Sequence, residues 1–300
     1  MTQIGIDFGG TKIEAAVLDK GGAFLTRQRI PTPDNYADAI RAVAGLVAQV
    51  EATAGAARSI GIGVPGSISP RTGVMRNANT TYLNGSSLQH DLEEALGRKI
   101  RLDNDANCLA LSEARDGAAA GARTTFAIII GTGCGGGVVV DGELISGANG
   151  IAGEWGHIPL PWPREDELPA PSCWCGQDGC LEKWISGTGF RDDYERRTGQ
   201  RPRGDEIVAL ARQGDVIASA VLDDYIDRLG RGMAVIANIL DPDCFVLGGG
   251  MSNVTELYDR LQPVIDRYTF SDSWSAKIVP AKWGDSSGVR GAAHLWPAEG

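Results

Sequence analysis

The sequence predicts an α/β protein with two lobes, and three features support this. The chain has 300 residues, which is enough for two domains with separate cores. Helical periodicity over residues 36–54 lies between strand-like runs at 3–7 and 59–64, an alternation typical of α/β domains. A glycine-rich apolar hairpin occurs near the N-terminus and again over a hundred residues later, which indicates a duplicated unit. The predicted lobes are residues 1–115, completed by a C-terminal helix at 288–300, and residues 116–287.

Each predicted hairpin has a turn of small residues. The first turn is Gly9-Gly10-Thr11-Lys12 and the second is Gly131-Thr132-Gly133, and a third glycine run, 248–250, follows the strand-like residues 244–247. Small residues let backbone N–H groups and threonine hydroxyls reach phosphate oxygens, and Asp7, before the first turn, is suited to hold Mg²⁺ through water. One such turn is explained equally well by hairpin sterics. Three of them favour a nucleotide site.

Composition and charge exclude several classes of protein. The net charge is -10 and no run of Lys and Arg is present, which argues against a nucleic-acid partner. The N-terminal residues lack the pattern of a secretory signal, and no stretch of about 18 apolar residues suggests a membrane span. We therefore expect a soluble, cytoplasmic protein that does not act at a membrane.

Residues 101–107 form a candidate catalytic segment. A strand-like run ends here in a polar cluster that includes Asp103, Asn104 and Asp105, and a helical pattern follows over residues 109–120. A carboxylate at such a junction can take a proton from a hydroxyl that attacks phosphorus, while a neighbouring amide orients the substrate. The alternative is that Asp103 or Asp105 only caps the helix, and this segment taken alone favours capping.

Four residues have the spacing of a metal site: His157, Cys173, Cys175 and Cys180, in the pattern H-x15-C-x-C-x4-C. Three thiolates and an imidazole make a closed tetrahedral set for Zn²⁺, which favours a structural metal. A buried histidine with free thiols, or a redox pair, explains the pattern less well. Two acids flank the set, Glu154 and Glu182; both are suited to accept hydrogen bonds from sugar hydroxyls, or alternatively to form surface salt bridges.

These motifs resemble those of the ROK family (repressors, uncharacterised reading frames and sugar kinases), and most of all its bacterial fructokinase or manno(fructo)kinase branch. The similarity is spread over nearly the whole chain, and its most specific part lies between His157 and Glu182. It implies an actin-like, hexokinase-type (ribonuclease H-like) fold, with ATP and Mg²⁺ in the cleft, structural Zn²⁺ and Asp105 as the base. The sugar contacts it implies are Gly66, Asn79, Asn104, Asp105, Glu154, His157 and Glu182. The residues it implies for ATP are Asp7, Gly9, Gly10, Thr11, Lys12, Gly131, Thr132, Gly133, Gly249 and Gly250.

The resemblance also suggests a reaction and its rivals. The interval between His157 and Cys173 is longer than is usual in the glucokinases and amino-sugar kinases of the family, which favours phosphorylation of the 6-hydroxyl of D-fructose, with mannose as a further substrate. A glucokinase, or an N-acetylglucosamine or N-acetylmannosamine kinase, is the alternative within the family. A catalytically inactive sugar-binding regulator is the alternative of another class. Only six residues precede Asp7, so no helix-turn-helix module is expected before it. A homodimer is the expected assembly.

Overall fold

The computed structural model describes residues 2–297, which form two compact units. The first unit contains residues 1–121, 137–152 and 282–300, and the second contains 122–136 and 153–281. Residues 137–152 thus group with the first unit, although the predicted limits placed them in the second lobe. The end of the predicted C-terminal helix, residues 298–300, lies outside the described residues.

The first unit is built on a five-stranded sheet of order β3-β2-β1-β4-β7. β1 pairs antiparallel with β2 and β2 with β3, whereas β1, β4 and β7 are parallel. All six residues of β4 are buried, because a central parallel strand is covered on both faces. The strands are β1 (Gln3–Phe8), β2 (Lys12–Leu18), β3 (Phe24–Pro31), β4 (Ser59–Val64) and β7 (Arg101–Asn104), with a small hairpin of β5 (Ser67–Ile68) and β6 (Met75–Arg76).

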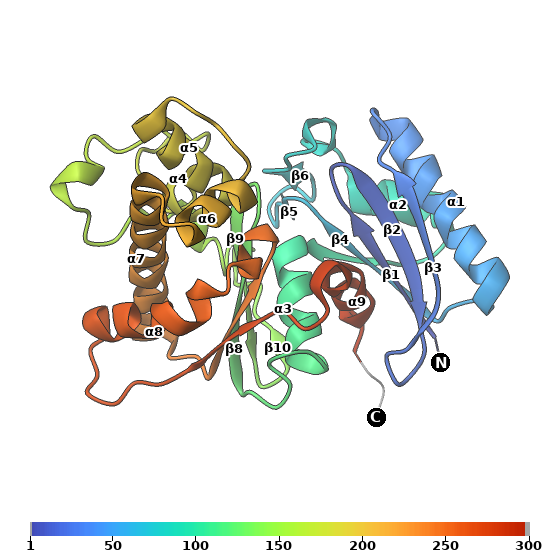
Figure 1. Ribbon diagram of the computed structural model, residues 1–300. Helices are drawn as coiled ribbons and strands as arrows, with labels where there is room; N and C mark the ends of the chain where they lie inside the picture. The colour runs from blue at the N-terminus through green and yellow to red at the C-terminus, as the bar shows by residue number, and fades with distance from the viewer. Residues whose placement is uncertain (1, 298–300) are drawn as a thin grey trace. The chain divides into compact units, whose positions relative to one another are not determined.

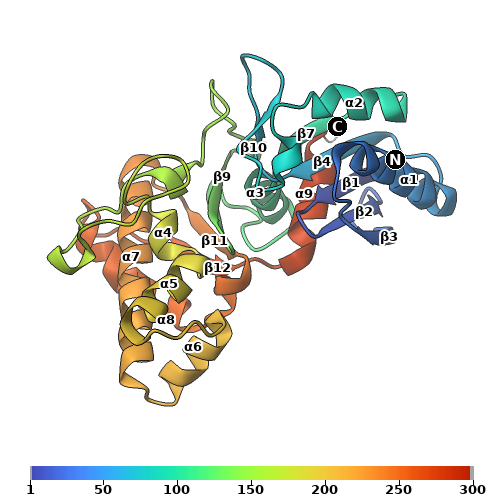
Figure 2. The same cartoon turned by 90° about the horizontal axis from the view of Figure 1, so that it is seen from above.

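Helices cover both faces of this sheet. α1 (Tyr36–Ala54) and α2 (Leu88–Leu96) share one apolar core with the sheet, while α3 (Asp105–Arg115) and α9 (Ser287–His294) pack on its other face (Figures 1 and 2). α1 matches its predicted range; Asn35 caps its start by accepting a hydrogen bond from the Asp38 N–H, and Gly55 ends it with a φ of 82°. α3 ends five residues before the predicted helical pattern does. Two short 3₁₀ turns complete the unit, η1 (Thr81–Leu83) and η5 (Gly284–Ser286).

α9 approaches the sheet so closely that only glycine fits at the contacts. A Cβ on Gly5 would lie 1.8 Å from the carbonyl oxygen of Val289, and one on Gly61 would lie 1.8 Å from that of Ala292. Real Cβ atoms do not come so near to a backbone oxygen, so both strands need glycine where α9 crosses them.

The second unit repeats the arrangement of the first. Its sheet has the order β10-β9-β8-β11-β12, in which β8, β11 and β12 are parallel and β9 and β10 form an antiparallel pair. The strands are β8 (Thr124–Ile130), β9 (Cys134–Val140), β10 (Glu143–Leu144), β11 (Cys244–Gly248) and β12 (Lys277–Pro280); β9 begins in the second unit and continues into the first, to which β10 belongs. Both sheets thus consist of a hairpin followed by parallel strands, which confirms the predicted α/β fold with a duplicated unit.

A long helix, α7 (Val216–Leu240), organises the helical part of the second unit. The other helices pack along it, as Figure 1 shows for α4, α5, α6 and α8. Asp215 caps its start by accepting a hydrogen bond from the Ala218 N–H. The helices are α4 (Glu182–Ile185), α5 (Gly187–Thr198), α6 (Gly204–Arg212) and α8 (Glu256–Tyr268), with 3₁₀ turns η2 (Trp155–His157), η3 (Glu165–Glu167) and η4 (Gly250–Asn253). Within residues 2–297 no helix combines the length and apolarity needed to cross a membrane.

The proline-rich interval 159–172 is held by buried charges on α7. Arg228 and Arg231 are both almost fully buried, and both donate to the carboxylate of Glu167, with N–O distances of 2.8 and 2.5 Å. Arg231 also donates to the carbonyl oxygens of Pro161 and Trp162. Burial alone would raise the pKa of Glu167, but hydrogen bonds from Arg231, the Arg164 N–H and Arg228 lower it to about 2. The interval therefore has an anchor of its own.

Replacing Glu167 with alanine should destabilise the second unit strongly. The change removes the carboxylate that two buried arginines share, and the loss of a buried partner costs up to about 3–5 kcal/mol; Arg228 keeps Asp193 and Arg231 keeps Asp227, which reduces the cost. Glu165→Ala, at an exposed position in the same 3₁₀ turn, is the matched control and should change the free energy of unfolding by less than about 0.5 kcal/mol. Urea unfolding of both variants measures this, and equal stabilities would contradict the anchor.

Candidate active site

The start of α3 presents Asp105 at the end of strand β7. Asn104 is the N-cap of the helix, and the Ala106 N–H lies 2.8 Å from both Asn104 Oδ1 and Asp105 Oδ1. The amide of Asn104 also donates to the carbonyl oxygen of Gly66, at 3.0 Å. Gly66 has a φ of 86°, and a Cβ there would lie 2.5 Å from the Arg76 carbonyl oxygen. Asn104 thus fixes the junction that carries Asp105.

Asp103, the other carboxylate of this segment, is committed to structure. It accepts hydrogen bonds from the Asn104 N–H at 2.8 Å, from Asn107 Nδ2 at 2.7 Å and from Ser146 Oγ at 3.4 Å. Burial nevertheless raises its pKa, against the effect of these bonds. Of the two carboxylates, Asp105 is therefore the better candidate for a base. The helix cap that the sequence assigned to an aspartate is Asn104, although Asp105 Oδ1 also accepts from the Ala106 N–H.

Asp7 lies at the end of β1, where its surroundings oppose ionisation. Burial, followed by the negative charges of Asp105 and Glu14, raises the pKa of Asp7 to about 6. Glu14 is its register partner on β2, and two arginines of β3, Arg27 and Arg29, already bind Glu14. Lys12 and Arg29 act in the opposite direction but do not offset these effects, so Asp7 is a partly buried acid whose ionisation a further cation would favour.

The adjoining turn is a tight hairpin that leaves its backbone accessible. The Gly9 N–H donates to the Lys12 carbonyl oxygen at 2.9 Å, and Thr32 Oγ1 donates to the Gly9 carbonyl oxygen at 2.7 Å. Gly10 and Thr11 are exposed at the tip, and Lys12 Nζ lies 3.7 Å from Asp285. Asn79 is also exposed in the first unit.

Asp7→Asn should stabilise the protein at neutral pH. A carboxyl pKa raised in the folded state lowers the free energy of unfolding as the pH rises from the ordinary value to the folded one. Because the shift from 3.8 to about 6 corresponds to about 1.4 kcal/mol per unit, removing the charge should add up to about 3 kcal/mol at pH 7. Unfolding without nucleotide or Mg²⁺ at pH 7 and at pH 3.5 measures this. The gain should disappear at pH 3.5, and a loss of stability at pH 7 would contradict the interpretation.

In the second unit, the turn Gly131–Gly133 is fixed from three sides. The Gly187 N–H donates to the Gly131 carbonyl oxygen at 2.7 Å, and Thr188 Oγ1 donates to the Thr132 carbonyl oxygen at 2.8 Å. The Cys134 N–H donates to Glu182 Oε2 at 2.9 Å, and a Cβ on Gly133 would lie 2.6 Å from the same oxygen. The N-termini of α4 and α5 thus hold the turn in a defined shape.

The segment 153–157 packs against this turn. Trp155 is buried and its Nε1 donates to the Gly135 carbonyl oxygen at 3.2 Å, and a Cβ on Gly156 would lie 2.3 Å from the Cys134 carbonyl oxygen. The flanking Glu154 is exposed and His157 is half-buried. This segment therefore places an acid and an imidazole beside the turn.

The third glycine run lies at the end of β11. Gly249 has a φ of 79°, and a Cβ on it would lie 2.5 Å from the Ile130 carbonyl oxygen. Gly250 begins the short turn η4. The run therefore lies beside the end of β8, the strand that leads into the Gly131 turn.

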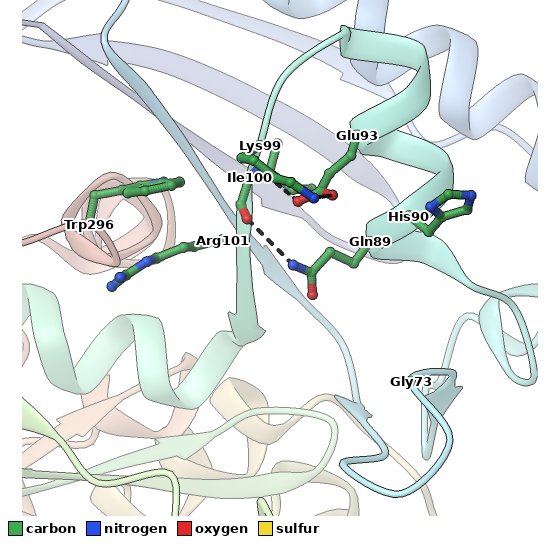
Figure 3. A pocket seen from close by; sticks show the side chains of 8 residues that line it. All are labelled: Gly73, Gln89, His90, Glu93, Lys99, Ile100, Arg101 and Trp296. Atoms are coloured by element: carbon green, nitrogen blue, oxygen red, sulfur yellow. Dashed lines mark hydrogen bonds and ion pairs between the residues drawn. The ribbon is translucent and has the colours of Figure 1, made fainter.

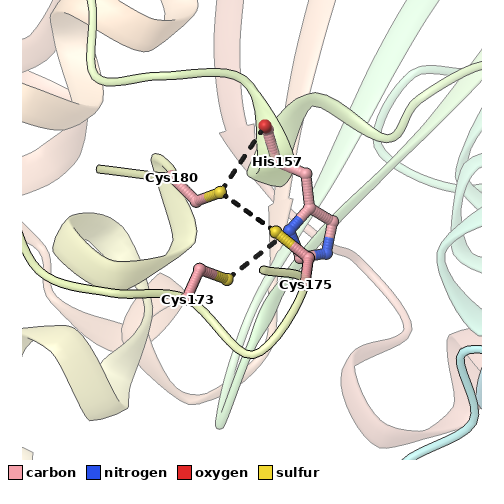
Figure 4. A group of neighbouring side chains, drawn as sticks. All are labelled: His157, Cys173, Cys175 and Cys180. Atoms are coloured by element: carbon pink, nitrogen blue, oxygen red, sulfur yellow. Dashed lines mark hydrogen bonds between the residues drawn. The ribbon is translucent and has the colours of Figure 1, made fainter. Parts of the chain in front are cut away.

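The four predicted metal ligands lie together (Figure 4). Their ligand atoms are all within 4.8 Å of one another, with 3.8 Å between Cys173 Sγ and His157 Nδ1 and 3.4 Å between Cys175 Sγ and Cys180 Sγ. Tetrahedral Zn²⁺ with bonds of about 2.3 Å to sulfur separates its ligands by about 3.7 Å. The spacing and the donor set fit a structural zinc, held by one imidazole and three thiolates.

Comparisons with known proteins agree with this geometry. A family profile described as "ROK family" matches residues 3–299. The chain belongs to the ROK family. It is 38% identical over 296 residues to an N-acetyl-D-glucosamine kinase of Yersinia enterocolitica (97% of this chain, 98% of that one) and 40% identical, with the same coverage, to one of Salmonella gallinarum. The structure of a ROK hexokinase from Thermus thermophilus matches with a TM-score of 0.87 and 34% identity, covering 98% of this chain and 97% of that one.

These findings place the chain among the sugar kinases of the ROK family and confirm the predicted actin-like, hexokinase-type fold. The histidine and cysteine cluster is consistent with the structural zinc of that family. Because relatives named N-acetyl-D-glucosamine kinase match over almost their whole length, they support the N-acetylglucosamine alternative better than the predicted fructose substrate. The roles of individual sugar and ATP contacts remain predictions.

The ROK protein should contain about one zinc per chain. Cys175→Ser removes one thiolate, so zinc should be lost and the second unit destabilised by several kcal/mol, because metal binding contributes directly to folding. Gln177→Ala, an exposed non-ligand in the same knuckle, is the control. Metal analysis and thermal unfolding measure both effects. A metal-free preparation of equal stability would contradict the site.

Two residues beside the site were not predicted from sequence. A Cβ on Gly288, in the first turn of α9, would lie 3.0 Å from Asp7 Oδ2. Trp174 donates through Nε1 to Glu182 Oε1 at 3.0 Å. Its place between two cysteine ligands was a signal that could have identified it, whereas nothing in the local pattern points to Gly288.

A cavity of about 550 Å³ in the first unit has none of the predicted site residues in its lining (Figure 3). Lys99 pairs with Glu93 at 2.7 Å, and Arg101 donates to the Leu295 carbonyl oxygen and lies over the Trp296 ring. Its charged groups are thus engaged with the protein itself.

Proposed function

We propose that this protein is an ATP-dependent kinase that transfers the γ-phosphoryl group to the 6-hydroxyl of N-acetyl-D-glucosamine. The observation that carries the proposal is the carboxylate of Asp105 at the first residue of α3, in a junction whose other carboxylate, Asp103, is occupied by hydrogen bonds. The full-length relatives named N-acetyl-D-glucosamine kinase supply the sugar.

In this proposal Asp105 accepts the proton of the 6-hydroxyl as its oxygen attacks phosphorus. A fixed carboxylate at a helix start needs little reorganisation for this step. Asn104, whose amide is already bound to Gly66, orients the sugar. The remaining sugar contacts are assigned to Gly66, Asn79, Glu154, His157 and Glu182.

The glycine-rich turns are assigned to ATP. Backbone N–H groups and hydroxyls at residues 9–12 and 131–133 would bind phosphate oxygens, and Gly249 and Gly250 would lie nearer the adenosine. Mg²⁺, bound with ATP, would neutralise charge that develops on the phosphates. Asp7 would hold it through water, and the raised pKa of Asp7 supports a cation there because Lys12 and Arg29 offset only part of the cost of its charge.

D-Fructose, with mannose, is the second candidate. One observation favours it: the 15-residue interval between His157 and Cys173. The full-length similarity to N-acetylglucosamine kinases outweighs this, because length in an interval that is anchored separately by Arg228 and Arg231 does not define the sugar pocket.

A cytoplasmic location and a homodimer stay part of the proposal. ATP is available in the cytoplasm, and thiols stay reduced there.

The substrate is tested by an ADP-release assay with Mg-ATP against five sugars: N-acetylglucosamine, N-acetylmannosamine, glucose, fructose and mannose. We expect kcat/KM to be highest for N-acetylglucosamine. A preference for fructose would move the assignment to the second candidate. Binding of a sugar without turnover of any would favour the catalytically inactive regulator.

Asp105→Asn tests the mechanism. An amide cannot accept the proton, so kcat should fall by about 10²- to 10⁴-fold while the KM for the sugar changes little. Asp259→Asn is the control, because Asp259 is an exposed aspartate in the first turn of another helix, α8. Steady-state kinetics of both variants decide the matter: an unchanged kcat for Asp105→Asn removes the proposed base.

A further inference from the structure

Trp174 is an exposed tryptophan held in one orientation. It lies between Cys173 and Cys175, and 60% of its surface is accessible. Its Nε1 donates to Glu182 Oε1 at 3.0 Å, and its ring meets that of His157 edge to face, with 5.1 Å between ring centroids. An aromatic side chain fixed on two sides but open to solvent is poised to bind a ligand with an apolar face.

The hydrogen bonds of Glu182 show on which side a ligand would approach. Oε2 accepts from the Cys134 N–H, so this oxygen faces the Gly131 turn. Oε1 accepts from Trp174, and as an oxygen of an ionised carboxylate it has a second lone pair. A sugar hydroxyl can therefore donate to Oε1 without displacing the indole. A sugar bound in this way would lie beside the indole ring.

We propose that Trp174 forms one wall of the sugar subsite and contributes to its affinity and specificity. Its exposed ring packs against the C–H face of a bound hexose, while its Nε1–H orients Glu182 Oε1 toward a sugar hydroxyl. This inference rests on the proposed function, because it takes Glu182 and His157 as sugar contacts. It adds a residue that no motif assigns.

A second exposed tryptophan, Trp162, has different neighbours from Trp174. Trp162, in the interval between His157 and Cys173, is 48% accessible and stacks on Tyr268, with 4.8 Å between ring centroids. It therefore provides a matched control: an exposed indole of similar accessibility whose partner lies on α8.

Kinetics with N-acetylglucosamine test the inference through Trp174→Ala, Trp174→Phe and Trp162→Ala. The alanine change should raise the KM for the sugar about 3- to 10-fold, because aromatic packing of this kind accounts for about that factor, with kcat and the KM for ATP changed less than about 2-fold. Trp174→Phe keeps the ring and should retain most of the affinity, and Trp162→Ala should match the wild type. An unchanged KM for Trp174→Ala, or a loss as large for Trp174→Phe, would overturn the proposal.

Fluorescence gives a readout that does not depend on turnover. N-acetylglucosamine should protect an indole from acrylamide quenching in the wild type and in Trp162→Ala, and the protection should be absent in Trp174→Phe. Zinc content should stay at about one equivalent in each variant. If Trp174→Ala loses zinc, its kinetics are set aside, and Trp174→Phe and the quenching experiment test the role of Trp174. Undiminished protection in Trp174→Phe refutes the role of Trp174, whereas a wild type that phosphorylates no sugar refutes the proposed function instead.

Discussion

The hydrogen bond from the Cys134 N–H to Glu182 Oε2 joins the chemically important parts of the second unit. Glu182 begins α4 directly after the cysteine knuckle, and Cys134 directly follows the Gly131 turn, so one carboxylate links the two segments. A Cβ on Gly133 would lie 2.6 Å from the same oxygen, so a larger residue there would push the carboxylate away from the Cys134 N–H. Any ligand that moves Glu182 therefore acts on the backbone of the turn. If Glu182 contacts the sugar and the Gly131 turn binds phosphate, as proposed, this hydrogen bond is a physical route from one to the other.

Two aspartates of the first unit, Asp103 and Asp7, have different surroundings. Asp103 has three hydrogen-bond donors that offset part of the effect of burial on its pKa, whereas Asp7 lies close to Asp105 and Glu14 and its pKa rises to about 6 although Lys12 and Arg29 act against this. A fold selected for stability alone would not retain such a group, since burying an uncompensated charge is costly. A side chain that lowers the stability of the fold is expected where a bound ligand supplies the missing interaction. The contrast between two aspartates of one unit agrees with the proposal that Asp7 helps to hold a cation.

Sequence patterns predicted those features of the fold that depend on neighbouring residues. The periodicity of α1, the apolar run of β4 and the spacing of the four metal ligands are local signals, and the structure bears them out. Contacts between distant segments have no such signal. Glu167 and Arg231 are 64 residues apart, and the approach of α9 to Gly5 and Gly61 depends on a helix near the other end of the chain. The division of the chain at residues 137–152 was likewise not predictable, because β9 crosses from one unit to the other without a break in its apolar pattern.

The interval between His157 and Cys173 shows why length is a weak guide to specificity in this site. Thiolates hold its far end through the knuckle, while Arg228 and Arg231 hold its middle through Glu167 and through backbone carbonyls. Residues between two separate anchors can be added or removed with little effect on either, since longer loops carry only a small additional entropic cost. A sugar, by contrast, is discriminated by the groups it touches. In the proposed subsite, the side chains around Glu182 Oε1, and Trp174 first among them, are therefore a better guide to the substrate than the number of residues in the interval.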